Sequence, residues 1–164
     1  MIKVVITALI RCLIEMIVIV TASPMAKPSL VLRFLPEDVR EAAKDHPEPA
    51  MHKQITAHIL LAVFLLSILA GVIYIGTEGI KDGCGFLSLT GRFIVMLYIM
   101  KAFDIIVQDQ WLVMTVGYFR KLYPETADCK GWNDRGFNNK KQIIRIIAYP
   151  FLSMIIAGIF ILIH

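Results

Sequence analysis

The sequence predicts an all-α protein of one domain: a polytopic membrane protein with a bundle of four transmembrane helices and a short cytoplasmic amphipathic helix in the first loop. Hydrophobic residues make up 57% of the 164 residues, against roughly 45–50% in average soluble proteins. The excess is concentrated in four blocks, each near the ~20 apolar residues that a helix needs to cross a bilayer. A β-barrel would instead show alternating segments of ~10 residues.

The first block, residues 2–22, is predicted to be a retained transmembrane helix. The small residues Thr21-Ala22-Ser23 resemble the cleavage site of a signal peptide. However, Lys3 is the only positive charge ahead of the apolar run, and Arg11 and Glu15 interrupt that run. We therefore expect a helix that stays in the membrane.

The cytoplasmic loop over 23–56 is predicted to contain a short helix over 36–46. Pro36 suits the first position of a helix, acidic residues follow in the first turn, and Pro47 closes the segment. A small apolar stripe along this helix consists of Val39, Ala42 and Ala43. Two interpretations stay open: the helix rests on the bundle or the membrane surface, or it docks a partner or acts as a lid.

The rest of the chain is predicted to hold three more transmembrane helices. The elements in order are helix 57–76, an outer loop 77–92, helix 93–112 with an extension to 119 left open, a cytoplasmic loop 120–142, and helix 143–163. The outer loop is rich in glycine, which is typical of a tight turn. Pro150 removes one backbone hydrogen bond from the last helix and predicts a kink there.

The distribution of basic residues predicts the orientation. The two long loops carry eleven Lys and Arg, whereas the outer loop and the first residues of the chain carry three. Because Lys and Arg stay on the cytoplasmic side, we expect both long loops in the cytoplasm and both termini outside, in the cell inner (plasma) membrane. The net charge of +4 then reflects topology and anionic lipid headgroups, and it does not indicate nucleic acid as a partner.

Cysteines, histidines and short motifs indicate no cofactor and no metal site. Cys12, Cys84 and Cys129 are expected to be free thiols in different compartments, and no CxxC or zinc spacing occurs. His52 and His58 flank the start of the second predicted helix, where interfacial histidines are the favoured interpretation over metal or haem ligands. Phosphate-binding, dinucleotide-binding and nucleophile-elbow motifs are absent from the sequence.

Charged residues inside two of the predicted helices are the strongest functional signal. A charge at mid-bilayer costs ~2.5–3.5 kcal/mol on the insertion scale, so such residues normally face the bundle interior and find partners. Arg11 and Glu15 lie four apart in the first helix, and Lys101 and Asp104 lie at matching depth in the third. If these two helices face each other, the four side chains form a neutral network.

The third predicted helix extends this cluster towards the cytoplasm. With α-helical periodicity, its polar stripe consists of Lys101, Asp104, Gln108, Trp111 and Thr115. Asp109 is expected about 140° around the helix from Asp104, where Arg145 of the fourth helix is expected to reach it. The candidate ligand-binding or proton-binding residues are Asp104, Asp109, Lys101, Gln108, Arg11 and Glu15, with Arg145, His52 and Trp111 as secondary candidates; no catalytic residue is assigned.

The chain resembles a group of small, four-helix bacterial integral membrane proteins. The resemblance rests on the runs Phe103–Leu112, Leu35–Val39 and Arg135-Gly136-Phe137. It covers most of the chain, implies the same topology, and points to Asp104 and Asp109. The group has no assigned activity, so no reaction is implied. Its Pro-Gly-Thr-Glu element appears in this chain only as Pro124-Glu125-Thr126.

Two interpretations of the charged cluster stay open. Either it lines a cavity that binds a polar ligand or relays a proton, or its charges pair and fix helix register or oligomeric contacts. The favoured function is the binding or transport of a small polar or ionic solute between the first and third helices. The alternatives are a non-catalytic accessory subunit of a membrane complex and, least favoured, a membrane enzyme acting on a lipid or prenyl-type substrate at the cytoplasmic interface. Because four helices are thin for a pore, we expect a homo-oligomer or a partner membrane subunit in the bilayer.

Overall fold

The prediction of an all-helical protein is confirmed. A computed structural model describes residues 1–163, which form helices and loops without a strand in that range. The long helices are α1 (Ile2–Ala22), α4 (Met51–Lys81), α5 (Phe86–Phe103) and α7 (Asn139–Ile163), and a π-helix, η1 (Asp104–Thr115), continues α5. The short ones are α2 (Pro28–Leu32), α3 (Glu37–Ala42), α6 (Tyr118–Leu122) and the 3-10 helices η2 (Pro124–Thr126) and η3 (Lys130–Asn133).

Three of the long helices are long and apolar enough to cross a membrane. Within residues 1–163 these are α1, α4 and α7. The fourth long element, α5 with η1, is not one of them, and its side chains include Arg92, Lys101, Asp104 and Asp109. A fourth transmembrane helix therefore stays a prediction.

The helices extend further than the apolar blocks that predicted them. Helix α4 begins before residue 57 and continues past residue 76, and α5 begins at Phe86. The connection expected over 77–92 is therefore a short turn over 82–85, where Gly83 has a φ of +70° that favours glycine. The physical reason is that a helix does not have to end where its apolar run ends, because polar residues continue it outside hydrocarbon.

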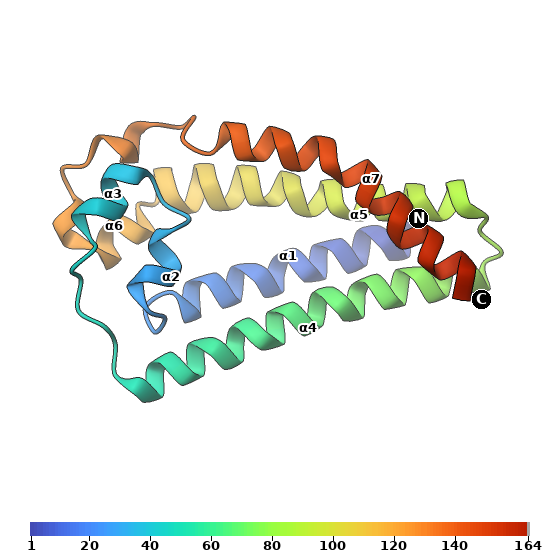
Figure 1. The fold of residues 1–164 in the computed structure, drawn as a ribbon, viewed down its shortest axis with the longest axis horizontal. Coiled ribbons are helices and arrows are strands. Elements are labelled where there is room, and N and C mark those ends of the chain that lie inside the picture. The colour runs from blue at the N-terminus through green and yellow to red at the C-terminus, as the bar shows by residue number, and fades with distance from the viewer. Residues whose placement is uncertain (164) are drawn as a thin grey trace.

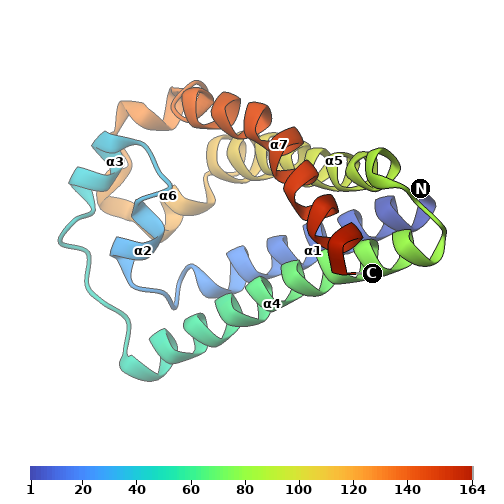
Figure 2. The same cartoon turned by 45° about the vertical axis from the view of Figure 1, so that its right-hand side comes forward.

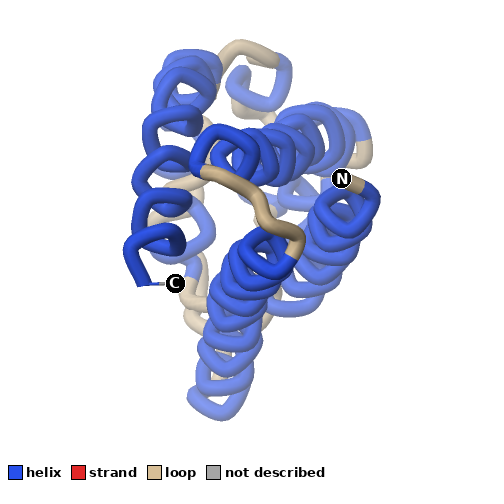
Figure 3. The backbone as a smooth tube through the Cα atoms, turned by 90° about the vertical axis from the view of Figure 1, so that its right-hand side faces the viewer, coloured by secondary structure: helices blue, strands red, loops and turns tan. Residues whose placement is uncertain are grey.

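The long helices pack in the order α4, α1, α5 and α7. Helix α1 lies between α4 and α5, and α7 packs along α5 (Figure 1). Helices α4 and α7 converge near the chain termini and diverge towards the other end (Figure 2). Where they meet, the backbone of Gly76 lies under the Phe160 ring, so a Cβ there would come within 2.3 Å of ring atoms. Viewed along the bundle, the four helices surround the molecule's long axis (Figure 3).

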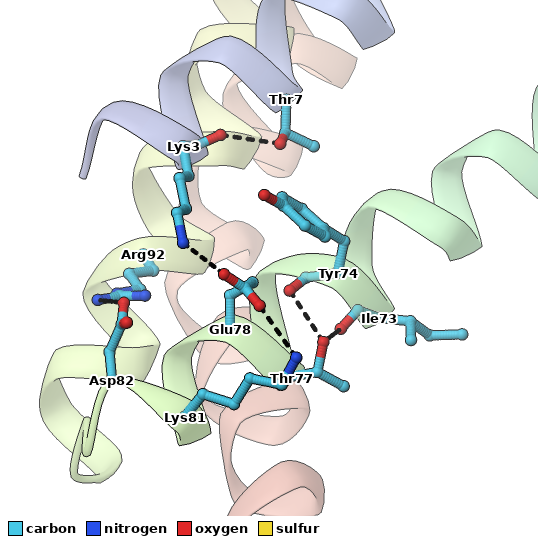
Figure 4. A network of polar contacts seen from close by, with 9 residues as sticks. All are labelled: Lys3, Thr7, Ile73, Tyr74, Thr77, Glu78, Lys81, Asp82 and Arg92. Carbon is cyan, nitrogen blue, oxygen red and sulfur yellow. Dashed lines mark hydrogen bonds and ion pairs between the residues drawn. The ribbon is translucent and has the colours of Figure 1, made fainter.

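Both termini lie at one end of the bundle, together with the short turn between α4 and α5 (Figure 1). Ion pairs join α1, α4 and α5 at this end (Figure 4). The Glu78 carboxylate accepts from Lys3 Nζ at 2.5 Å and lies 3.2 Å from Lys81 Nζ. Arg92 donates to Asp82, directly after α4, at 2.7 Å. The Arg92 guanidinium holds the pKa of Asp82 below its usual range. The basic residues at this end are thus matched by acids.

The short helices form a cap over the opposite end. Helix α3, within the predicted range 36–46, packs on η2 and η3. Val39 and Trp132 are almost fully buried there, and the Asp38 carboxylate accepts a hydrogen bond of 2.7 Å from the Gly131 backbone N–H. Of the predicted apolar stripe, Val39 and Ala43 are buried and Ala42 is exposed. The two buried residues of the stripe therefore pack within the chain.

Candidate functional site: an acidic cluster between α1 and the π-helix

The helix that carries most of the candidate residues changes its winding at Asp104. From Asp104 to Thr115 it is a π-helix, in which the backbone hydrogen bonds join residues five apart. Residues four and five apart then lie nearly above one another. Gln108 and Asp109 therefore both lie on the Asp104 side of η1, and the predicted separation of about 140° between Asp104 and Asp109, which assumed α-helical geometry, is wrong. Long π-helices are rare, and π-bulges are frequent at functional sites.

Lys101 and Asp104 form the pair at the centre of the cluster. Lys101 is buried, with 3% of its side chain exposed, and its ammonium forms an ion pair with the Asp104 carboxylate one turn further on. The Asp104 side chain is 25% exposed. The pair thus lies within one helix rather than between two.

Two side-chain amides hold Asp109, one from α7 and one from the residue directly before α7. Its Oδ2 accepts hydrogen bonds from Gln142 Nε2 at 2.5 Å and from Asn138 Nδ2 at 3.2 Å. Arg145 is exposed, and among residues 1–163 no ion pair joins it to Asp109. The predicted contact is therefore wrong, because the residue one turn earlier on α7 is the one that faces η1.

Glu15 brings α1 into the cluster. Its carboxylate lies within electrostatic range of Asp104 and Lys101, in agreement with the close packing of α1 against α5. Tyr149 of α7 lies within electrostatic range of Glu15 and Asp104. Glu15, the two aspartates and Tyr149 therefore converge from three helices. We call the set of Glu15, Lys101, Asp104, Gln108 and Asp109 the acidic cluster.

Arg11 departs from the predicted four-charge network. Its Nη1 donates to Ser67 Oγ of α4 at 2.5 Å, and its guanidinium carbon lies 4.7 Å from the centre of the Phe64 ring. It still interacts with Glu15 electrostatically, but its direct partners are on α4. The expected neutral network is thus divided, because a hydroxyl and an aromatic ring on α4 hold the guanidinium.

The division leaves the acidic cluster with an excess of carboxylates. Within residues 1–163 it holds three acids, Glu15, Asp104 and Asp109, and one base, Lys101. No group of three or more His, Cys, Asp or Glu in the described part of the chain is placed to hold a metal ion. Counted with all four groups ionised, the cluster therefore has two more negative than positive charges.

Two secondary candidates are not part of this cluster, and the sequence analysis missed several residues that contact the candidate residues. His52 is exposed at the start of α4, and Trp111 is 50% exposed. The missed residues are Ser67, Phe64, Asn138, Gln142 and Tyr149. The only local signal for the polar ones among them was a polar residue beside or within an apolar run, which is too common to identify a site, and Phe64 gave no signal at all.

No family model matches the chain, and neither does any curated protein or solved structure. The function is therefore argued from the geometry.

Proposed function

We propose that the chain is an integral membrane protein that binds a small polar or ionic solute, or its coupling proton, at the acidic cluster and moves it across the bilayer. In this proposal α1, α4, α5 with η1, and α7 all cross the membrane. The cap lies in the cytoplasm and both termini lie outside. Three apolar helices, the two termini at one end and the excess of basic residues in the cap loops support this topology.

The observation that carries the proposal is the excess of carboxylates in the acidic cluster. An uncompensated charge in a low-dielectric environment is costly, so charges there are paired or neutralised. Lys101 balances Asp104, and Arg11 is engaged on α4. A proton or a cationic solute therefore balances the remaining acids. Because Glu15 interacts with Asp104 from another helix, a proton or cation bound at Glu15 alters the contact between α1 and η1.

Proton flux into liposomes tests the proposed role of Asp104. Purified protein is reconstituted with an internal pH dye, and a negative internal potential is imposed with potassium and valinomycin. We expect uptake above that of empty liposomes in the wild type and in Asp82→Asn, which changes an acid in the exposed turn, and none in Asp104→Asn. Equal uptake in wild type and Asp104→Asn, or wild-type uptake equal to that of empty liposomes, would refute transport through this cluster. Failure of Asp104→Asn to accumulate in the membrane would favour a structural role for Asp104.

Two native cysteines test the topology. Cys84 lies in the turn between α4 and α5, and Cys129 lies in the cap; both are partly exposed. A membrane-impermeant maleimide applied to intact cells is expected to label Cys84, and to label Cys129 only after permeabilisation. Single Cys84→Ser and Cys129→Ser variants assign the two signals. Labelling of Cys129 in sealed cells would invert the proposed orientation.

A further inference from the structure

Helix α7 contains a proline in the middle of its length. Pro150 is the twelfth of its 25 residues, and the helix bends partway along its course (Figure 1, Figure 2). Proline has no backbone N–H, so it cannot donate to the carbonyl four residues earlier, and its ring clashes with that carbonyl. The carbonyl concerned belongs to Ile146, which therefore lacks its usual donor within α7.

A tyrosine on the neighbouring helix takes the place of the missing donor. The hydroxyl of Tyr98, on α5, donates to the Ile146 carbonyl at 3.1 Å. The rings of Tyr98 and Tyr149 lie 6.3 Å apart between their centroids, with their planes inclined by 49°, a separation that is usual for aromatic pairs. One residue of α5 thus contacts α7 on both sides of the peptide bonds that the proline disturbs.

In the proposed topology this hydrogen bond lies in hydrocarbon. Tyr98 is the thirteenth of the 18 residues of α5, which η1 then continues, so it lies as far from the helix ends as Pro150 does. Tyr98 and Ile146 are 36% and 37% exposed on the surface of the bundle. Lipid offers no hydrogen bonds there, so a backbone carbonyl freed by a proline needs a donor from the protein itself.

The two halves of α7 have different neighbours. The half before Pro150 contributes to the candidate site, since Gln142 donates to Asp109 and Tyr149 lies within electrostatic range of the acidic cluster. The half after it instead meets α4, where its aromatic ring at position 160 covers the backbone of Gly76. The angle between the halves therefore decides how Gln142 and Tyr149 approach η1 and α1.

We propose that Tyr98 is a positioning residue for the acidic cluster. Its hydroxyl replaces the helical donor that Pro150 removes, fixes the bend of α7, and so holds Gln142 and Tyr149 against the cluster. The importance of that position rests on the proposed function, whereas the exchange of one hydrogen-bond donor for another does not depend on transport. It follows that the Tyr98 hydroxyl matters only while position 150 lacks a backbone N–H.

A double-mutant cycle tests this exchange of donors. The unfolding equilibrium constant of the full-length protein is measured by denaturation in mixed micelles. Tyr98→Phe removes only the hydroxyl and is expected to raise this constant at least about fivefold, because a carbonyl is left unsatisfied. Pro150→Ala restores a backbone N–H to α7, and in that background Tyr98→Phe is expected to change the constant by less than about twofold. Equal losses in the two backgrounds, or no loss in Tyr98→Phe alone, would overturn the proposal.

Spin-label distances test the bend itself. Labels are attached at Lys53→Cys on α4 and Lys141→Cys on α7, both exposed, after the three native cysteines are replaced by serine. Tyr98→Phe is expected to broaden the distance distribution. Pro150→Ala is expected to shift its mean by at least about 3 Å, since the residues of α7 before the bend span about 15 Å.

Tyr74→Phe is the matched control for both measurements. It removes a hydroxyl on α4 that makes no hydrogen bond within residues 1–163 (Figure 4), and it is expected to change neither the unfolding constant nor the distances. A distribution that Tyr98→Phe leaves unchanged would show that the proline alone sets the bend, and would overturn the proposal. Neither measurement uses transport, so a failure here is distinct from a failure of the flux experiment.

Discussion

Two oppositely charged residues one turn apart on α1 have different surroundings. Glu15 lies near η1, within electrostatic range of Asp104 and Lys101. One turn earlier, Arg11 reaches α4, where a hydroxyl and an aromatic ring hold it. The surroundings of Glu15 have an excess of negative charge, whereas Arg11 is a cation with two donors that lack a hydrogen-bond partner among the described residues.

The difference shows that sequence spacing alone does not pair charges inside a bundle. Arg11 and Glu15 are four apart, the spacing at which an acid and a base on a helix surface interact. In this bundle the direct partners of the two side chains come from different neighbouring helices, η1 for Glu15 and α4 for Arg11. The single neutral network that the spacing predicts is therefore divided, although Arg11 and Glu15 still interact through space.

The largest expected effect comes from breaking the ion pair between Lys101 and Asp104, which lies near Glu15. Lys101→Met leaves the Asp104 carboxylate without its ion-pair partner, and removing one member of a buried pair costs about 3–5 kcal/mol. We expect this loss in the free energy of unfolding, measured by denaturation in mixed micelles. The double variant Lys101→Met/Asp104→Leu removes both charges and is expected to recover most of it. A small loss in Lys101→Met alone would mean that Asp104 is solvated or otherwise paired.

A smaller effect is expected where α7 holds the same cluster. Gln142→Leu removes the shorter of the two hydrogen bonds to Asp109, and a hydrogen bond to a charged group contributes about 1.5–3 kcal/mol. We expect a loss in that range from the same unfolding measurement. Arg145→Leu is the matched control one turn further along α7 and is expected to change little. A larger loss of stability in Arg145→Leu than in Gln142→Leu would instead identify Arg145 as the partner of Asp109.

The smallest expected effect tests whether Arg11 and Glu15 act as one charge network or as two. A double-mutant cycle with Arg11→Gln and Glu15→Gln measures the energy that couples the two side chains. Because their direct partners lie on different helices and the two side chains act on each other only through space, we expect a coupling energy of no more than about 0.5 kcal/mol, the size usual for an ion pair four residues apart on a helix. A coupling energy of about 1–3 kcal/mol would instead show that the two charges act as one network.

The long helices are predictable from the sequence because the length of each apolar block indicates a helix rather than a strand and gives its approximate extent. Residues 2–22 were predicted as a helix, and α1 covers the same range. The short turn over 82–85 was not predictable from hydropathy, since α4 and α5 continue into polar sequence. The π-helix was also missed, because the apolar pattern around Asp104 fits an α-helix equally well.

The candidate site was predictable in its residues but not in its contacts. Charges within apolar blocks identified Glu15, Lys101 and Asp104 directly. The partners of Arg11 and Asp109 come from α4 and α7, and nothing in the local sequence indicates which side of α1 or η1 each helix covers. Contacts of this kind depend on packing between segments far apart in the chain.

The central claim is that a proton or a cationic solute balances the acids of the acidic cluster, and infrared spectroscopy tests it most directly. The protein is reconstituted in lipid at neutral pH, with the bulky cation N-methylglucamine as the only cation in the buffer. A protonated carboxyl group gives a C=O band distinct from that of a carboxylate. We predict such a band in the wild type and in Glu78→Gln, whose acid is paired with Lys3, and its loss in Glu15→Gln. Absence of the band in the wild type, with every acid ionised and no cation to bind, would contradict the account.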